Sequence, residues 1–256
     1  MPGLLVAPAA VAFCLLALPL LGLLVRAPWR DLRQLLTSHD TLAALRLSLE
    51  CATAATAISL VLGVPLAFVL ARSRVRGLRL ARALVTLPLV LPPVVGGVAL
   101  LMALGRRGVV GRYLDQWFGL TLPFTVKGVI LAETFVAMPF LVIAVEGAIR
   151  SADRGLEEAA VTLGASRMTV FRRITLPAIA PSLAAGSVLC WARALGEFGA
   201  TITFAGNLPG TTQTMPLYIY TAFERDPRAA VALSLVLLVV AVAVLAGLRE
   251  HWLRAP

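Results

Sequence analysis

Two charged side chains, Arg193 and Glu197, lie one helical turn apart inside a strongly apolar stretch of the sequence. An ionisable group at membrane depth costs at least ~2.5–3.5 kcal/mol on insertion scales, so it usually faces a bundle interior or a water-filled path. The i,i+4 spacing also allows the two charges to satisfy each other. A self-satisfied pair and a place on an ion pathway both remain open. Gly196 and Gly199 would let another helix or an anion approach the backbone closely.

Helix-breaking residues interrupt another apolar stretch, at Pro92, Pro93, Gly96 and Gly97. Such residues free backbone polar groups, which a membrane tolerates where the backbone is buried in protein or lines a watery cavity. We therefore predict a gating or pore-lining role for this segment, with a packed kink as the alternative.

A polar segment of about residues 150–177 separates two apolar stretches. Ser151 or Asp153 can cap a helix at its start. Glu157 and Glu158 would then lie in the first turns of that helix, where the positive end of the helix dipole favours them. The segment is thus predicted to begin with a short helix.

A bend and a second short helix are expected to follow. Gly164 is suited to end the first helix in a left-handed conformation, and Ser166 can cap the second. Pro177 cannot continue an ordinary helix interior, so we expect it to end the second helix before the next apolar stretch.

The composition places these segments in a membrane protein. Apolar residues make up 59% of the 256 and charged residues 14%, whereas soluble domains are near half apolar and a quarter charged. Mean hydropathy is +0.90. Stretches of about 20 apolar residues match a ~30 Å hydrocarbon core. We predict an all-α polytopic protein in which residues 1–256 form a single transmembrane domain with six spans, at 4–25, 52–71, 83–104, 126–149, about 178–199 and 229–248.

The distribution of positive charge predicts the orientation. The net charge is +10, and the connection 72–82 carries five arginines and no acid. Short loops of this kind are retained in the cytoplasm. That rule places both termini and the segment 150–177 in the cytoplasm, and it accounts for the basic residues without nucleic acid.

The polar segment also carries a recognisable pattern. Glu158-Ala159-Ala160, three residues, Gly164, nine residues, Ile174, one residue and Leu176-Pro177 resemble the EAA loop of ABC-importer permeases. The resemblance implies the type I importer architecture and a helix that docks in a cleft of a cytoplasmic ATPase. An amphipathic helix on lipid headgroups is the alternative, but two glutamates and small alanines favour protein contact. The residues implied in coupling are Glu157, Glu158, Ala159, Ala160, Gly164, Ala165 and Ser166.

A second resemblance concerns the cargo. The segment 204–220, with Asn-Leu-Pro-Gly and Thr-Gln-Thr-Met-Pro-Leu, is similar to that of molybdate ABC permeases. Sulfate and thiosulfate permeases share the Gly-Glu-Phe-Gly-Ala core at 196–200, so tungstate and sulfate remain alternatives to molybdate. The residues implied in the translocation pathway are Arg193, Glu197, Gly199, Pro92, Pro93 and Gly96.

The resemblance implies an assembly in a bacterial inner membrane. It consists of a homodimer of this chain, two ATPase subunits and a periplasmic or surface-tethered oxyanion-binding protein. This chain is expected to be a permease without catalytic residues, cofactor or metal. A membrane enzyme or haem anchor is disfavoured because the only histidines, His39 and His251, lie outside the spans. A secondary transporter is the nearer rival, since it too uses broken helices and membrane charges.

Overall fold

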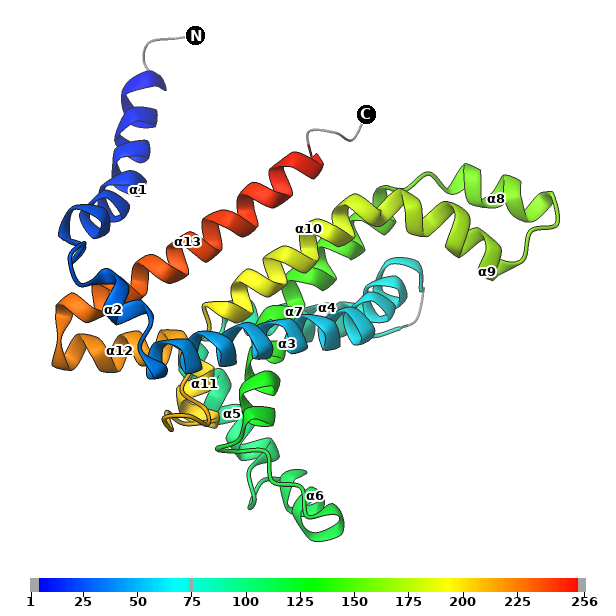
Figure 1. The fold of residues 1–256 in the computed structure, drawn as a ribbon. Helices are drawn as coiled ribbons and strands as arrows, with labels where there is room; N and C mark the ends of the chain where they lie inside the picture. Colours follow the sequence, from blue (N-terminus) through cyan, green and yellow to red (C-terminus); the bar gives the residue numbers. More distant parts are fainter. Residues whose placement is uncertain (1–4, 74–75, 253–256) are drawn as a thin grey trace.

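The computed structural model describes residues 5–73 and 76–252, with side chains up to residue 244, and these ranges contain helices and no strand (Figure 1). The predicted all-α class is therefore confirmed. In chain order the helices are α1 (Val6–Arg26), α2 (Leu32–Leu36), α3 (His39–Arg72), α4 (Leu78–Val90), α5 (Pro93–Leu104), α6 (Gly111–Phe118), α7 (Val126–Ser151), α8 (Arg154–Thr162), α9 (Arg167–Val170), α10 (Leu176–Leu195), α11 (Gly199–Phe204), α12 (Met215–Arg225) and α13 (Pro227–Trp252).

Helix α7 is the centre of the bundle and contacts both α3 and α10. In the apolar 18-residue stretch of α7, 61% of the residues are buried. In the corresponding stretch of α1, which lies at the edge of the molecule, none is buried (Figure 1). Small residues bring these helices together, because a Cβ placed on Gly186 of α10 would lie 2.9 Å from the Ala144 Cβ of α7. Close approach at small residues is the usual way in which helices associate within lipid.

The predicted count of six spans is not confirmed. Within the described residues, five helices are long and apolar enough to cross a membrane: α1, α3, α7, the continuous helix Arg167–Leu195 and the part of α13 from Pro227 to Val244. The expected span 83–104 is instead two shorter helices, α4 and α5. They separate at Leu91 and Pro92, because a proline cannot donate the backbone hydrogen bond that would continue α4.

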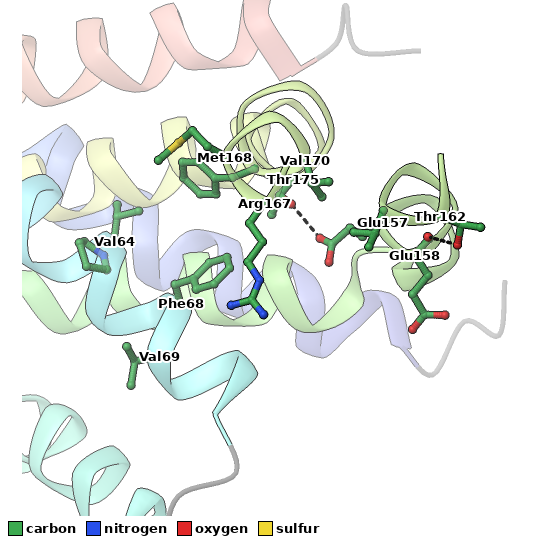
Figure 2. A pocket seen from close by; sticks show the side chains of 13 residues that line it. Val64, Phe68, Val69, Glu157, Glu158, Thr162, Arg167, Met168, Val170 and Thr175 are labelled. Atoms are coloured by element: carbon green, nitrogen blue, oxygen red, sulfur yellow. Dashed lines mark hydrogen bonds between the residues drawn. The ribbon is translucent and has the colours of Figure 1, made fainter. Parts of the chain in front are cut away.

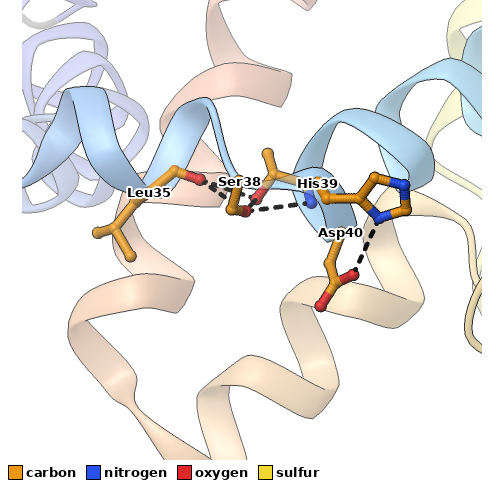
Figure 3. A network of polar contacts seen from close by, with 5 residues as sticks. Leu35, Ser38, His39 and Asp40 are labelled. Atoms are coloured by element: carbon orange, nitrogen blue, oxygen red, sulfur yellow. Dashed lines mark hydrogen bonds and ion pairs between the residues drawn. The ribbon is translucent and has the colours of Figure 1, made fainter.

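Helix α3 begins well before the apolar stretch 52–71. Its N-cap is Ser38, whose hydroxyl accepts a hydrogen bond from the Thr41 N–H at 3.3 Å (Figure 3). The Thr41 hydroxyl donates to the Leu35 carbonyl at 2.9 Å, which ties the start of α3 to α2. The helix has 34 residues, or roughly 51 Å at ~1.5 Å per residue. It therefore extends beyond a ~30 Å hydrocarbon core.

The arginine-rich segment 72–82, which comprises the end of α3, the connection and the start of α4, is partly engaged within the protein. Arg72 and Arg82 pair with glutamates of α8 and α7, whereas Arg74 lies outside the described residues. The chain ends, residues 1–4 and 253–256, also lie outside them. The cytoplasmic location of both termini stays a prediction.

Candidate functional site

Helices α8 and α9 form a hairpin at one end of the bundle (Figure 1). Asp153 caps α8, since its carboxylate accepts a hydrogen bond from the Gly155 N–H at 2.8 Å. Gly164 follows the helix with φ +84°, and its N–H donates to the Val161 carbonyl at 2.9 Å. The Ala165 N–H donates to the Ala160 carbonyl at 3.0 Å. These two bonds are the Schellman motif of a glycine-terminated helix, so the predicted end at Gly164 is confirmed.

The second helix of the hairpin does not stop at Pro177. Ser166 caps α9 as expected, accepting from the Thr169 N–H at 3.2 Å. The helix then passes through a π-helical turn, Phe171–Thr175, directly into α10. A proline ring collides with the carbonyl four residues earlier in a regular helix. Here the wider π turn precedes Pro177, with the Leu176 N–H bonded to the Phe171 carbonyl, so the predicted break at Pro177 is wrong.

The hairpin exposes apolar side chains. Leu163 at its tip is 88% exposed, and Leu156, Val161 and Met168 are each more than half exposed. Exposed apolar side chains gathered on one small element usually mark an interaction surface.

A cavity of about 900 Å³ lies between the hairpin and the C-terminal part of α3 (Figure 2). Most of its surface is apolar, with Val64 and Phe68 on α3 facing Val161 and Met168 on the hairpin. Phe68 also contacts Phe171 edge to face, with ring centroids 5.9 Å apart. That contact holds the base of the hairpin against α3.

The structure brings the predicted coupling residues together on one hairpin but gives them different environments. Glu158, Ala159, Gly164 and Ser166 are exposed, and Ala160 and Ala165 are half-buried. Glu157 instead points toward the bundle, where its Oε1 lies 2.7 Å from Arg72 Nη2. The role of the set in coupling stays a prediction.

Two interruptions between helices, one between α4 and α5 and the other between α10 and α11, form a second region of interest. The break before α5 meets the break before α11, because a Cβ on Gly199 would lie 2.7 Å from the Pro93 Cβ. One turn along α5, a Cβ on Gly97 would lie 1.7 Å from the Thr203 Oγ1 of α11. Gly96 faces another way, toward the Phe135 ring of α7. Discontinuous helices that meet inside a bundle recur at the substrate sites of transporters.

The predicted ion pair lies at the edge of this contact. Arg193 Nη1 is 2.6 Å from Glu197 Oε2, and the Glu197 side chain is only 1% exposed. The pair spans the end of α10 at Leu195, and Glu197 Oε1 accepts from the Ala200 N–H of α11 at 2.8 Å. The predicted ion pair is therefore confirmed, although its members do not share one helix and Glu197 Oε2 has no hydrogen-bond partner among the described residues.

The two glycines beside the pair behave differently. The predicted close approach is confirmed at Gly199, which contacts Pro93. No other helix approaches Gly196 within the described residues, since a Cβ there would meet only the Ala192 carbonyl oxygen, at 3.6 Å. Gly196 ends α10 and is exposed, so the approach of an anion there stays a prediction.

Two polar features of the bundle were not assigned from the sequence. Glu133 on α7 is 1% exposed, and a lone acid within an apolar run is the signal that could have drawn attention to it. Asn207 Nδ2 donates to Thr221 Oγ1 at 3.0 Å, and Gln213 Nε2 donates to Asn207 Oδ1 at 2.9 Å. The segment between α11 and α12 is therefore a loop fixed by side-chain hydrogen bonds within itself and to α12.

A family assignment accords with this architecture. Residues 59–254 match the family described as binding-protein-dependent transport system inner membrane component. Because the match covers more than half of the chain, the protein belongs to this family of multi-pass transport permeases. The predicted resemblance to ABC-importer permeases is thereby confirmed.

Two named relatives and one solved structure show which transport proteins the chain resembles. The chain is 51% identical to the molybdenum transport system permease protein ModB of Mycobacterium tuberculosis, over 94% of this chain and 90% of the relative. It is 43% identical to the ModB protein of Escherichia coli K12, over 82% of this chain and 92% of the relative. Among solved structures, a bacterial alginate ABC transporter in complex with an alginate-bound periplasmic protein has the same fold. The TM-score is 0.77 at 22% identity, covering 96% of this chain and 91% of that one.

Proposed function

We propose that this chain is the membrane permease subunit of an ATP-driven molybdate importer. It would act as a homodimer with two cytoplasmic ATPase subunits and a periplasmic or surface-tethered oxyanion-binding protein. ATP hydrolysis belongs to the partner subunits, and this chain needs no cofactor of its own. The hairpin, the connection between α3 and α4 and both termini would face the cytoplasm.

The α8–α9 hairpin is the observation that carries the proposal. Its tip presents Leu163, which is 88% exposed, and α8 also exposes Glu158. A short rigid helix that fits into a protein groove buries such apolar side chains and transmits rigid-body motion. A helix lying on lipid headgroups would instead favour basic residues on its polar face, whereas α8 exposes the carboxylate of Glu158. An ATPase groove therefore suits the hairpin better than a lipid surface.

The pathway is proposed to run along the meeting helix breaks. The residues proposed for it are Pro92, Pro93, Gly96 and Gly199. The irregular backbone lies at Leu91 and Pro92 before α5 and at Gly196–Phe198 before α11, and membranes tolerate such backbone where it is buried or lines water. The Arg193 side chain is 28% exposed and pairs with Glu197, and we propose that its guanidinium also meets the passing anion. Closure of the ATPase dimer would displace the hairpins and open the path outward, and hydrolysis would reset it.

Molybdate is the proposed cargo because relatives 51% and 43% identical are named as molybdenum transport permeases. The fold alone does not select it, since molybdate, tungstate and sulfate are all tetrahedral dianions. Selection among them belongs mainly to the binding protein.

Competitive uptake tests the cargo and the energy source together. In vesicles that contain the full complex, molybdate uptake should require internal ATP and should be inhibited by tungstate more strongly than by sulfate. Stronger inhibition by sulfate would mean that sulfate, not molybdate, is the preferred cargo. The assignment as an ATP-driven transporter would still stand. Uptake in energised vesicles that lack the ATPase would instead indicate a secondary transporter.

Thiol labelling tests the pathway at the helix break. Val94→Cys and Val95→Cys, whose native side chains are about half exposed, should react with a water-soluble thiol reagent at rates that change when ATP binds. The background should carry Cys14→Ser, because Cys14 is exposed whereas Cys51 and Cys190 are buried. Leu141→Cys, at a fully buried position of α7, serves as the unreactive control. Labelling rates that do not change with ATP at either position would mean that this helix break does not line the pathway.

A further inference from the structure

The neighbouring glutamates of α8 do not share one environment. The Glu157 side chain is 20% exposed, and its Oε1 lies 2.7 Å from Arg72 Nη2 and accepts the Thr175 hydroxyl at 2.8 Å. Glu158 is exposed and makes no ion pair within the described residues. One carboxylate is therefore held by this chain, and the other is available to a partner.

The contacts of Glu157 join three separate elements. Arg72 is the last residue of α3, 85 positions before Glu157 in the sequence. Thr175 is the last residue of the π-helical turn that leads into α10. Glu157 thus links α8 to the ends of two helices that both pack against α7.

Side-chain packing between α3 and the hairpin is limited. Phe68 and Phe171 contact edge to face at the base of the hairpin, but a cavity of about 900 Å³ lies between α3 and the rest of the hairpin (Figure 2). The polar link is also sheltered, because the Arg72 side chain is only 17% exposed. Partly buried pairs are screened by salt much less than exposed ones.

The guanidinium depends on this partner. Arg72 Nε is buried without a hydrogen-bond partner among the described residues, and Glu157 is the acid paired with its Nη2. Removing one member of a buried pair leaves the other charge uncompensated, which is strongly unfavourable. The link should therefore persist while α8 moves.

We infer that Glu157 is a positioning residue that transmits displacement of α8 to α3 and α10 through Arg72 and Thr175, while Glu158 faces the ATPase. This role rests on the proposed function, since it presupposes an ATPase docked on the hairpin. Glu157 is assigned no contact with that ATPase. Its loss should uncouple hydrolysis from transport and leave the complex assembled.

A charge exchange tests the link in the full complex in vesicles, with ATPase and binding protein present. Glu157→Arg and Arg72→Glu should each keep the ATPase bound and hydrolysing, while molybdate uptake per ATP falls about ten-fold. The double exchange should restore uptake per ATP to within about three-fold of wild type, because the opposite charges face each other again. Thr175 can still accept a hydrogen bond from the exchanged arginine.

The same exchange at an exposed pair of α3 is the matched control. Arg46 and Glu50 pair at 2.7 Å with side chains 81% and 58% exposed, so exchanging them should leave uptake per ATP unchanged. If the charge reversals at 157 fail to fold, Glu157→Gln keeps the shape and should lower uptake per ATP about three-fold.

The outcomes distinguish a failure of the positioning role of Glu157 from a failure of the proposed function. Loss of ATPase binding in Glu157→Arg would place Glu157 in the docking contact, overturning its positioning role but supporting the proposed function. Unchanged uptake per ATP in both single variants, or a folded double exchange without rescue, would also overturn the role. A wild-type chain that binds no ATPase would contradict the proposed function itself.

Discussion

Replacing Gly164 with proline is expected to abolish co-purification of the permease with its ATPase and to lower ATP-driven uptake by at least about a hundred-fold. Gly164 has φ +84°, whereas proline is fixed near −65°. The variant also loses the N–H that donates to the Val161 carbonyl. Because this turn sets the angle between α8 and α9, the docking surface should be misplaced while the spans stay folded.

Two milder substitutions at Gly164 test whether ATPase binding requires the left-handed backbone conformation and not the glycine itself. Gly164→Asn should retain most binding, since asparagine tolerates the left-handed conformation, and Gly164→Ala should be intermediate, at a cost of ~1–2 kcal/mol. Glu158→Lys should abolish ATPase binding without altering the backbone, because Glu158 is exposed. Normal assembly and uptake in both Gly164→Pro and Glu158→Lys would refute docking at the hairpin.

Local features of the hairpin were predictable from the sequence. The caps at Asp153 and Ser166 and the turn at Gly164 each depend on residues only a few positions apart. The free energy of each cap depends only on residues within one short segment, so the segment alone predicts it. The same reasoning located the Arg193–Glu197 pair, whose members are four residues apart.

The interruptions of the helices were harder to place. Within an apolar run, hydrophobic periodicity carries little information about where one helix ends. Hence the division of 83–104 at Leu91 and Pro92 was not anticipated as two helices. The opposite error occurred at Pro177, where a π-helical turn lets the helix continue. A π turn is a local rearrangement without a simple sequence signature.

Contacts between distant segments could not be derived. Glu157 and Arg72 are 85 residues apart, so nothing in the local pattern distinguished Glu157 from its neighbour Glu158. The contact of Gly199 with Pro93 likewise depends on how α5 and α11 cross. Both pairs depend on tertiary packing, which a single sequence does not encode in any short window.

Replacing Gly97 with alanine is expected to separate α5 from α11 and to destabilise the permease by at least ~1–3 kcal/mol, the cost of overpacking a close contact. A Cβ at Gly97 would lie 1.7 Å from Thr203 Oγ1 and 2.7 Å from the Ala200 carbonyl oxygen. Rotation of Thr203 away would break its hydroxyl bonds to the Gly199 and Ala200 carbonyls, at 2.9 and 3.1 Å. Thermal unfolding of the purified complex should therefore begin at a lower temperature, and uptake should fall with it.

A second substitution tests whether this crossing is the cause. Thr203→Ala removes the oxygen nearest to a Cβ at Gly97 but leaves the Ala200 carbonyl at 2.7 Å. Gly97→Ala combined with Thr203→Ala should therefore recover part of the lost stability, giving a non-additive double-mutant cycle. Gly147→Ala is the control, because a Cβ on this exposed glycine of α7 meets nothing within 4 Å and alanine favours the helix. Unchanged stability in Gly97→Ala would mean that α5 and α11 do not approach this closely, and the meeting of the two helix breaks would then no longer support a pathway there.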